Sequence, residues 1–187
     1  MTADRHFLPA CLLLLVTGLA SAGEIWVDVD TDQRTLSVLD GSEIVLAFAN
    51  IAVGRNGVSA GKSAHDRKTP LGTYHVRRIN NASRFQLFFA LDYPTPEQAA
   101  NAYRSHQISA AELEAIYRAH ERGEEPPFDT PLGGDIGIHG IGNGDPRIHE
   151  DFNWTDGCVA LTNEQVEELA KWVQPGTVVV IRAASND

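Results

Sequence analysis

The alternation of apolar and polar residues predicts that the chain begins with β-strands. Residues 25–30, Ile-Trp-Val-Asp-Val-Asp, alternate in the way that a half-buried strand does. Residues 35–39 and 43–53 give two further strands, and Asp-Gly at 40–41 is typical of a hairpin turn. We therefore predict a β-meander at the start of the folded domain.

Turn signals and apolar runs predict two more strands in the middle of the chain. A polar, Gly-rich loop over residues 54–67 leads into Pro70 and Gly72, which together make a stiff turn. A strand over residues 74–79 is expected to follow this turn. Residues 85–91 are apolar and aromatic, so we expect another strand there.

Residues 95–123 interrupt the β pattern with two helices. Thr-Pro at 95–96 is typical of a helix start, and Ser-Ala-Ala-Glu at 109–112 is a capping box that starts a second helix, which ends at Gly123. The resulting helical hairpin has two open interpretations. It is either a surface element that only packs on the sheet or a lid over a functional site.

The C-terminal third returns to short strands. Residues 135–139 predict a strand, and the glycines of residues 140–154 indicate a loop. A second capping box at 162–165 begins a helix that is expected to reach about Val173, and residues 177–182 form the final strand. The predicted fold class is therefore mainly β with helices (α+β).

The first 22 residues have the features of a secretory signal peptide. The apolar run at 12–16 lies in a stretch too short to span a bilayer, and Ala-Ser-Ala at 20–22 is a small-x-small cleavage site. We therefore predict a single domain over residues 23–187, exported to the periplasm or cell envelope and without a membrane span. Lipidation at Cys11 is disfavoured, because the apolar run follows this cysteine instead of preceding it.

The composition excludes several classes of partner. The formal net charge is −10 and the chain has no basic run, so nucleic acid and anionic lipid are poor partners. The sequence contains no CxxC, HExxH or P-loop motif. A zinc site made of His139, His149 and Cys158 lacks the usual ligand spacing. We expect a monomer without a metal or another cofactor.

Cys158 is the candidate nucleophile. Cleavage of the signal peptide would remove Cys11 and leave Cys158 without a disulfide partner, and an unpaired thiol in an oxidising compartment is a liability unless it is used. Gly157 before it allows a tight turn with backbone N–H groups directed at a ligand. The alternative is that Cys158 is simply a small buried hydrophobic residue.

His139 is the candidate general base for this thiol. An imidazole can take the thiol proton, and the imidazolium that results stabilises the thiolate. The other ring nitrogen then needs a hydrogen-bond acceptor that fixes the tautomer, either a backbone carbonyl or a carboxylate. We expect the side chains of His139 and Cys158 to approach to hydrogen-bond distance or slightly beyond.

These residues resemble the signature of the L,D-transpeptidase (YkuD-type) catalytic domain. That signature is a histidine before glycine, about fifteen further residues, then Ser or Thr, a variable residue, Gly and Cys. Here Ile-His-Gly at 138–140 is followed, after the fifteen residues 140–154, by Thr-Asp-Gly-Cys at 155–158. Thr-Pro-x-Gly-x-Tyr at 69–74 resembles the upstream element of the family. The resemblance covers residues 25–181 and implies a YkuD-like β-sandwich or barrel with an inserted helical hairpin near residues 95–123.

The resemblance also implies acyl transfer on peptidoglycan stem peptides. Cys158 would attack the carbonyl between meso-diaminopimelate and D-alanine, release D-alanine, and pass the thioester to an amine. His139 would be the base, oriented by the backbone carbonyl of Gly140, and the N–H groups of Gly157 and Cys158 would form the oxyanion hole. Two alternatives remain open: a thiol hydrolase (an L,D-carboxypeptidase or a hydrolase of peptidoglycan–protein links), and a cell-wall binding module with an incidental cysteine.

Two positions depart from the family pattern. Asp156 stands where many members have a basic residue or histidine, and Ala160 stands where many have arginine, so recognition of a substrate carboxylate should be weaker. Two interpretations stay open for Lys62, Arg67, Lys68 and Arg147: either one of them faces the Cys158 pocket and replaces the missing arginine, or all four are ordinary surface charges. The candidate substrate-binding residues are Thr155, Asp156, His149 and Arg147. Trp154 is interpreted as packing under the turn, and His65 and His75 are interpreted as structural or surface residues.

Overall fold

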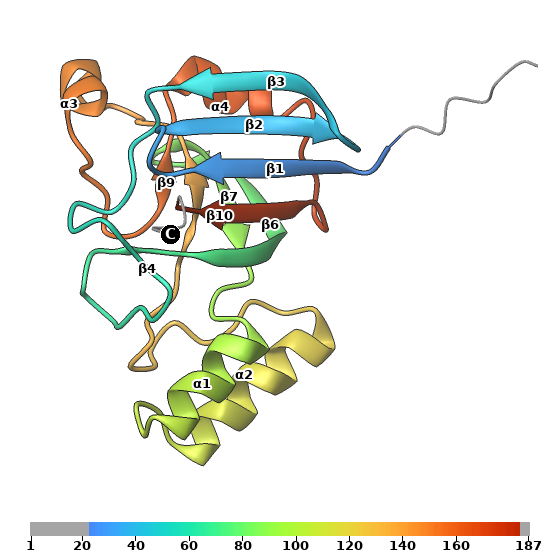
Figure 1. Ribbon diagram of the computed structural model, residues 1–187, viewed down its shortest axis with the longest axis vertical. Coiled ribbons are helices and arrows are strands. Elements are labelled where there is room, and N and C mark those ends of the chain that lie inside the picture. The colour runs from blue at the N-terminus through green and yellow to red at the C-terminus, as the bar shows by residue number, and fades with distance from the viewer. Residues whose placement is uncertain (1–22, 184–187) are drawn as a thin grey trace, which may run out of the picture.

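A mixed eight-stranded sheet forms the body of the protein in the computed structural model, which describes residues 23–183. The order across the sheet is β3-β2-β1-β10-β6-β7-β8-β9 (Figure 1). The pairs β1–β10 and β8–β9 are parallel, and the other neighbours are antiparallel. The strands of this sheet are β1 (Ile25–Asp30), β2 (Thr35–Asp40), β3 (Glu43–Ala49), β6 (Gly72–Ser83), β7 (Gln86–Leu91), β8 (Gly137–His139), β9 (Val159–Ala160) and β10 (Val178–Arg182).

The two edges of the sheet meet through the segment that follows β3. Strands β3 and β9 are the edge strands. Ala52 forms an antiparallel bridge with Ala160 of β9, with N–H···O=C distances of 3.0 and 2.7 Å. The sheet is thus closed at this point in the manner of a barrel, with the backbone groups of Ala52 and Ala160 paired. The predicted third strand, 43–53, is therefore wrong in its last residues, because the buried run 51–53 pairs with β9 and not with β2.

The hydrophobic core lies within the closed sheet and beneath α4 (Asn163–Leu169). The alternation in β1 buries Val27 and Val29 completely, and β2 buries Leu36 and Val38 in the same way. Helix α4 adds Val166 and Leu169, which are spaced at i and i+3 and so face the same side. Other fully buried side chains are those of Ile51, Tyr74, Phe89, Ile138, Val159, Leu161 and Val179. The mainly β prediction is confirmed.

The helical hairpin consists of α1 (Pro96–Arg104) and α2 (Ala110–Arg122), and it projects from one end of the sheet (Figure 1). Both helices begin with the predicted capping residues, Thr95 and Ser109, and Gly123 ends α2 in the left-handed conformation. The hairpin has a small hydrophobic cluster of its own, made of Ala99, Ala102, Ile108, Ile116 and Leu132. The predicted insertion near residues 95–123 is confirmed.

Three smaller differences from the sequence predictions concern α3, the end of α4 and a pair of short strands. The loop predicted over 140–154 contains a short helix, α3 (Pro146–Asp151), for which Asp145 is the N-cap. Helix α4 ends at Leu169, earlier than the predicted Val173. A separate two-stranded pair, β4 (Val58–Ser59) and β5 (Thr69–Pro70), lies in the predicted loop and turn. The predicted signal peptide, with Cys11, lies outside the described residues.

Among the described residues, no helix is both long and apolar enough to span a membrane. The predicted organisation into one domain over residues 23–187 stays a prediction, since four residues at its end lie outside the described part of the chain.

Tyr74 links the sheet to the hairpin and supplies a test of this packing. Its buried hydroxyl donates to the carbonyl of Leu71 at 3.0 Å and accepts from Nε2 of Gln98 in α1 at 2.7 Å. Tyr74→Phe should lower the free energy of unfolding by about 1 kcal/mol, because both hydrogen bonds of the hydroxyl are lost while Nε2 of Gln98 keeps the carbonyl of Leu71 as an acceptor at 3.2 Å. Urea denaturation measures this loss.

The matched control is Tyr103→Phe in α1, the helix that also carries Gln98, because the side chain of Tyr103 is exposed. That variant should change the free energy of unfolding by less than about 0.5 kcal/mol. Equal effects of the two substitutions would contradict the assigned role of the Tyr74 hydroxyl.

Candidate active site

Two threonine hydroxyls hold the turn that carries Cys158. Oγ1 of Thr155 donates to the carbonyl of Cys158 at 2.7 Å and accepts from the N–H of Gly157 at 3.1 Å. Oγ1 of Thr69 reaches the same carbonyl at 3.4 Å and accepts from the N–H of Gly54 at 2.8 Å. Both threonines are buried. The Thr-Pro-x-Gly element therefore contacts the nucleophile turn directly, although it lies far from it in the sequence.

Glycine is the only residue type that fits at position 157. Its φ is +138°, and a Cβ there would lie 2.9 Å from the carbonyl oxygen of Lys68 and 3.0 Å from Cδ1 of Ile136. Its N–H already donates to Thr155, as described above. The predicted contribution of Gly157 to an oxyanion hole thus competes with an internal hydrogen bond, whereas the N–H of Cys158 has no such competitor among the described hydrogen bonds.

His139 ends β8 and is almost completely buried among aromatic rings. Its ring stacks on Phe85, with centroids 4.2 Å apart, and on Phe88 at 5.9 Å, and the edge of Trp154 approaches it at 5.8 Å. Nδ1 lies 2.7 Å from the carbonyl oxygen of Gly140. Because a carbonyl oxygen only accepts, Nδ1 carries the hydrogen and Nε2 keeps a free lone pair.

Cys158 and His139 line the same cavity, which has a volume of about 750 Å³. The parallel pairing of β8 with β9 brings them together, because His139 lies opposite Ala160, two positions after the cysteine. The thiol donates to the backbone carbonyl of Asp135 at 3.3 Å. In this arrangement the thiol hydrogen bond is made to the backbone and not to the imidazole, so the expected His139–Cys158 contact stays a prediction.

Burial shifts the pKa values of His139 and Cys158 in directions that disfavour a thiolate–imidazolium ion pair. It lowers the pKa of His139 to about 4, although the hydrogen bond to Gly140 opposes this change. Burial raises the pKa of the Cys158 thiol to about 12, and the carboxylate of Asp135 adds to this while a hydrogen bond with the Gly137 backbone opposes it. At neutral pH the site therefore holds a neutral thiol and a neutral imidazole.

The structure places two of the four predicted substrate-binding residues at the cavity of Cys158 and the other two elsewhere. Thr155 and Asp156 line the cavity of Cys158. Arg147 does not, because its guanidinium is exposed and pairs with Asp145 at the start of α3. His149 does not either: it is buried on the inner side of α3, where Nδ1 accepts from Nε1 of Trp154 at 3.3 Å. Helix α3, which was not foreseen in this loop, thus places both side chains away from the cavity of Cys158, and their role in substrate binding stays a prediction.

The cations of this cavity also differ from the expected set. None of Lys62, Arg67, Lys68 and Arg147 lines it, whereas Arg55 and Arg84 do. The ammonium of Lys62 is buried and bound to Asp66 at 2.7 Å and to the carbonyl of Ser63 at 3.2 Å. Neither Arg55 nor Arg84 could be predicted from local sequence, because each belongs to a loop that reaches the site only through strand pairing.

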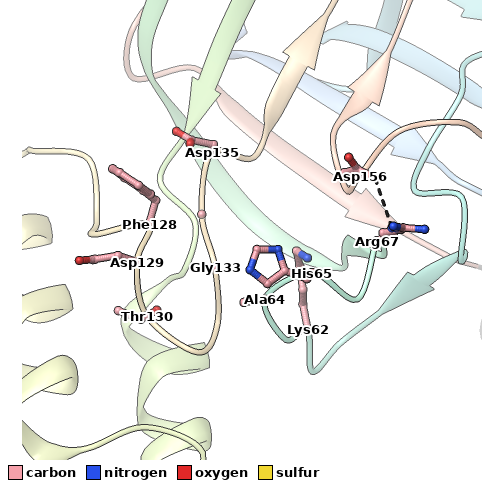
Figure 2. A pocket seen from close by; sticks show the side chains of 11 residues that line it. Lys62, Ala64, His65, Arg67, Phe128, Asp129, Thr130, Gly133, Asp135 and Asp156 are labelled. Atoms are coloured by element: carbon pink, nitrogen blue, oxygen red, sulfur yellow. Dashed lines mark ion pairs between the residues drawn. The ribbon is translucent and has the colours of Figure 1, made fainter.

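A second cavity of about 420 Å³ adjoins the first and shares Asp135 and Asp156 with it. Figure 2 shows His65 and Arg67 on one side of it, facing the connector that carries Asp129. This connector follows the helical hairpin, but no residue of α1 or α2 lines either cavity. The geometry of the described residues therefore supports the surface-element interpretation of the hairpin over the lid.

Within residues 23–183, no group of three or more His, Cys, Asp or Glu side chains could hold a metal ion. The chemistry that the site offers comes from the thiol, the imidazole and the surrounding backbone and guanidinium groups. Asp135, Phe85 and Phe88 are further residues of this site that the sequence analysis missed.

Comparison with known proteins identifies similar sequences and folds. A family model described as the L,D-transpeptidase catalytic domain, YkuD, matches residues 24–181. No curated protein matches the chain by sequence. The helical cell shape determining protein Pgp2 from Campylobacter jejuni has a similar structure, with a TM-score of 0.59 and 23% identity over 89% of this chain and 50% of that chain.

Bd1075 from Bdellovibrio bacteriovorus is also similar in structure, with a TM-score of 0.54 and 19% identity over 86% of this chain and 48% of that chain. The present chain thus spans about half the length of these two proteins. At this identity the likeness concerns the fold alone.

The buried imidazole makes the stability of the protein dependent on pH. The unfolded chain binds a proton at His139 below pH 6.5, whereas the folded chain binds it only near pH 4. The free energy of unfolding should therefore fall as the pH drops, by about 3 kcal/mol between pH 7 and pH 4 on account of this group. Urea denaturation at several pH values measures the change.

His139→Gln isolates this contribution, because it removes the titrating group and leaves the others. The variant should lose less stability than the wild type over the same interval, and His106→Asn, at an exposed histidine, should behave like the wild type. Parallel curves for the wild type and His139→Gln would show that the imidazole is not held neutral by burial.

Proposed function

The chain belongs to the family of the L,D-transpeptidase (YkuD) catalytic domain, and from this premise we propose that it is a cell-envelope cysteine acyltransferase of peptidoglycan stem peptides. The observation that carries the proposal is the shared cavity of Cys158 and His139, in which Nε2 of the imidazole keeps its lone pair. A binding module has no need of this arrangement, so the enzyme is favoured over the non-catalytic alternative.

The proposed first half-reaction forms a thioester. Nε2 of His139 takes the thiol proton while Sγ of Cys158 attacks the carbonyl between meso-diaminopimelate and D-alanine. The tetrahedral oxyanion accepts hydrogen bonds from backbone N–H groups of the turn, with that of Cys158 as the main donor and that of Gly157 as the second. The imidazolium then returns the proton to the amine of D-alanine, which leaves.

The proposed second half-reaction regenerates the thiol. An amine of another stem peptide attacks the thioester carbonyl and gives a proton to Nε2 of His139. The new amide forms as the C–S bond breaks, and the imidazolium protonates the departing sulfur. The carbonyl of Gly140 stabilises the imidazolium in both halves, because it accepts from Nδ1 at 2.7 Å.

The pKa values of Cys158 and His139 bear on the step at which the thiol proton is transferred. A thiol with a pKa of about 12 and an imidazole with a pKa of about 4 do not form an ion pair in the free protein. Proton transfer is therefore coupled to the attack itself, so that the negative charge passes to the substrate oxygen. This general-base route differs from that of cysteine enzymes that rest as a thiolate–imidazolium pair.

Hydrolysis of the same thioester is the second candidate. The polar residues Asn80, Ser83 and Asp135 line the cavity and can hold water near the carbonyl. Water would then replace the amine, and the protein would act as an L,D-carboxypeptidase or cleave peptidoglycan–protein links.

Incubation with disaccharide–tetrapeptide muropeptides, followed by mass spectrometry, tests the proposal. We expect release of D-alanine, an enzyme mass increased by the acyl group, and either cross-linked products or tripeptides. Cys158→Ala should lose at least about a thousandfold in kcat/KM, because no covalent route remains.

Two controls accompany this experiment. The melting temperature of Cys158→Ala should stay within a few degrees of the wild type, since the hydrogen bonds of the thiol with the backbone of Asp135 and Gly137 are weak. His139→Gln should lose activity while His106→Asn keeps it. Wild-type turnover by Cys158→Ala would refute the proposed mechanism.

A further inference from the structure

We propose that Arg55 binds the substrate carboxylate beside the scissile bond, and that Asp156 is its internal counter-ion in the free protein. The proposal rests on the proposed function for the identity of the substrate, a stem peptide that ends in a D-alanine carboxylate. It makes Arg55, which lies outside the His139 and Cys158 motifs, the residue that selects ligands with a negatively charged carboxylate.

The backbone of Arg55 is fixed to the nucleophile segment. Its N–H donates to the carbonyl of Thr155 at 2.9 Å, and the neighbouring Gly54 forms a parallel bridge with the same threonine. The hydroxyl of Thr155 also donates to the carbonyl of Cys158 and so stabilises the turn that carries the thiol. The position of the guanidinium is thus tied to the position of the thiol, which a specificity residue needs.

The side chain of Arg55 enters the cavity that holds both Cys158 and His139. Its guanidinium is about half exposed and lies 2.9 Å from Oδ1 of Asp156. A guanidinium presents paired N–H donors that match a carboxylate, and the aspartate occupies the guanidinium through one contact at Nη2.

Asp156 is well suited to give way to a ligand. Its side chain is 73% exposed, and an ion pair so exposed is weak and screened by salt. It also lies near Arg67 of the second cavity, at 3.7 Å from Nε, so it keeps a partner when Arg55 turns to a ligand (Figure 2). A substrate carboxylate can therefore replace Asp156 at Arg55 without leaving the aspartate unpaired.

The other cations near the site are less suited to this task. Lys62 is buried and already bound to Asp66. Arg147 pairs with Asp145 outside the cavity. Arg84 lines the cavity, but its guanidinium lies over the ring of Phe85 at 4.6 Å, where it caps the aromatic wall of His139. Arg84 is therefore the matched alternative that the experiment must include.

The experiment measures binding in a Cys158→Ala background, so that it does not depend on turnover. The ligands are a tetrapeptide stem that ends in D-alanine and the same peptide with a terminal carboxamide, titrated by calorimetry at low salt. With Arg55 present, the carboxylate peptide should bind at least about tenfold more tightly than the amide. With Arg55→Gln, this preference should disappear, because the affinity for the carboxylate peptide falls and that for the amide does not.

Four further variants test the direction of the effect and the identity of the residue. Asp156→Asn should strengthen binding of the carboxylate peptide, because Arg55 loses its internal competitor, and Arg55→Lys should keep part of the preference. Arg84→Gln and Arg118→Gln, the latter on the exposed face of α2, should leave the ratio between the two peptides unchanged.

The outcomes separate this inference from the proposed function. An unchanged ratio in Arg55→Gln, or a ratio lost in Arg84→Gln instead, overturns the inference. A preference that depends on Arg55, in a wild-type protein that turns over neither peptide, supports the inference and refutes the acyltransferase. No preference for the carboxylate with Arg55 in place also overturns the inference, whatever the turnover.

Discussion

The position of the thiol depends on one carbonyl group, that of Cys158, which accepts hydrogen bonds from the hydroxyls of Thr155 and Thr69. Thr155 lies only 3 positions from Cys158 in the sequence, whereas Thr69 lies 89 positions away. The bridge between Ala52 and Ala160, next to the turn in the sequence, pairs the segment after β3 with β9. The turn of Cys158 is therefore held by one local contact and one long-range contact, and the second exists only in the folded domain.

The same closure explains which features the sequence could predict. Strand alternation and capping boxes are determined by near neighbours, so the meander and the helical hairpin follow from local patterns. Most residues around Cys158 and His139 do not, and Arg55, for example, reaches the cavity only through the pairing of its loop with Thr155. Asp145 followed by Pro146 is a helix-start signal within a Gly-rich stretch, and the prediction of a loop over residues 140–154 did not use it.

The aromatic surroundings of His139 restrain the reactivity of the site at rest. Stacking on Phe85 and Phe88 removes water from the imidazole and weakens it as a base, and burial also keeps the thiol protonated. Since the thiolate is the form that oxidants and disulfides attack, a shift that favours the protonated thiol lowers the reactivity of Cys158 at rest. In the proposed reaction, the developing charge on a bound substrate offsets the larger barrier to proton transfer.

The charge of the whole protein and the charge of the site act in opposite directions. A net charge of −10 would repel the proposed substrate, which carries carboxylates, but salt screens this field beyond about 8–10 Å. In the proposed function, attraction comes from direct contact with a few guanidinium groups. An unpaired arginine on an acidic protein would be held by whichever carboxylate lies nearest, and Asp156 provides that carboxylate beside the cysteine. The cation thus stays ordered at the site, and its release to a ligand needs only the breaking of an exposed ion pair.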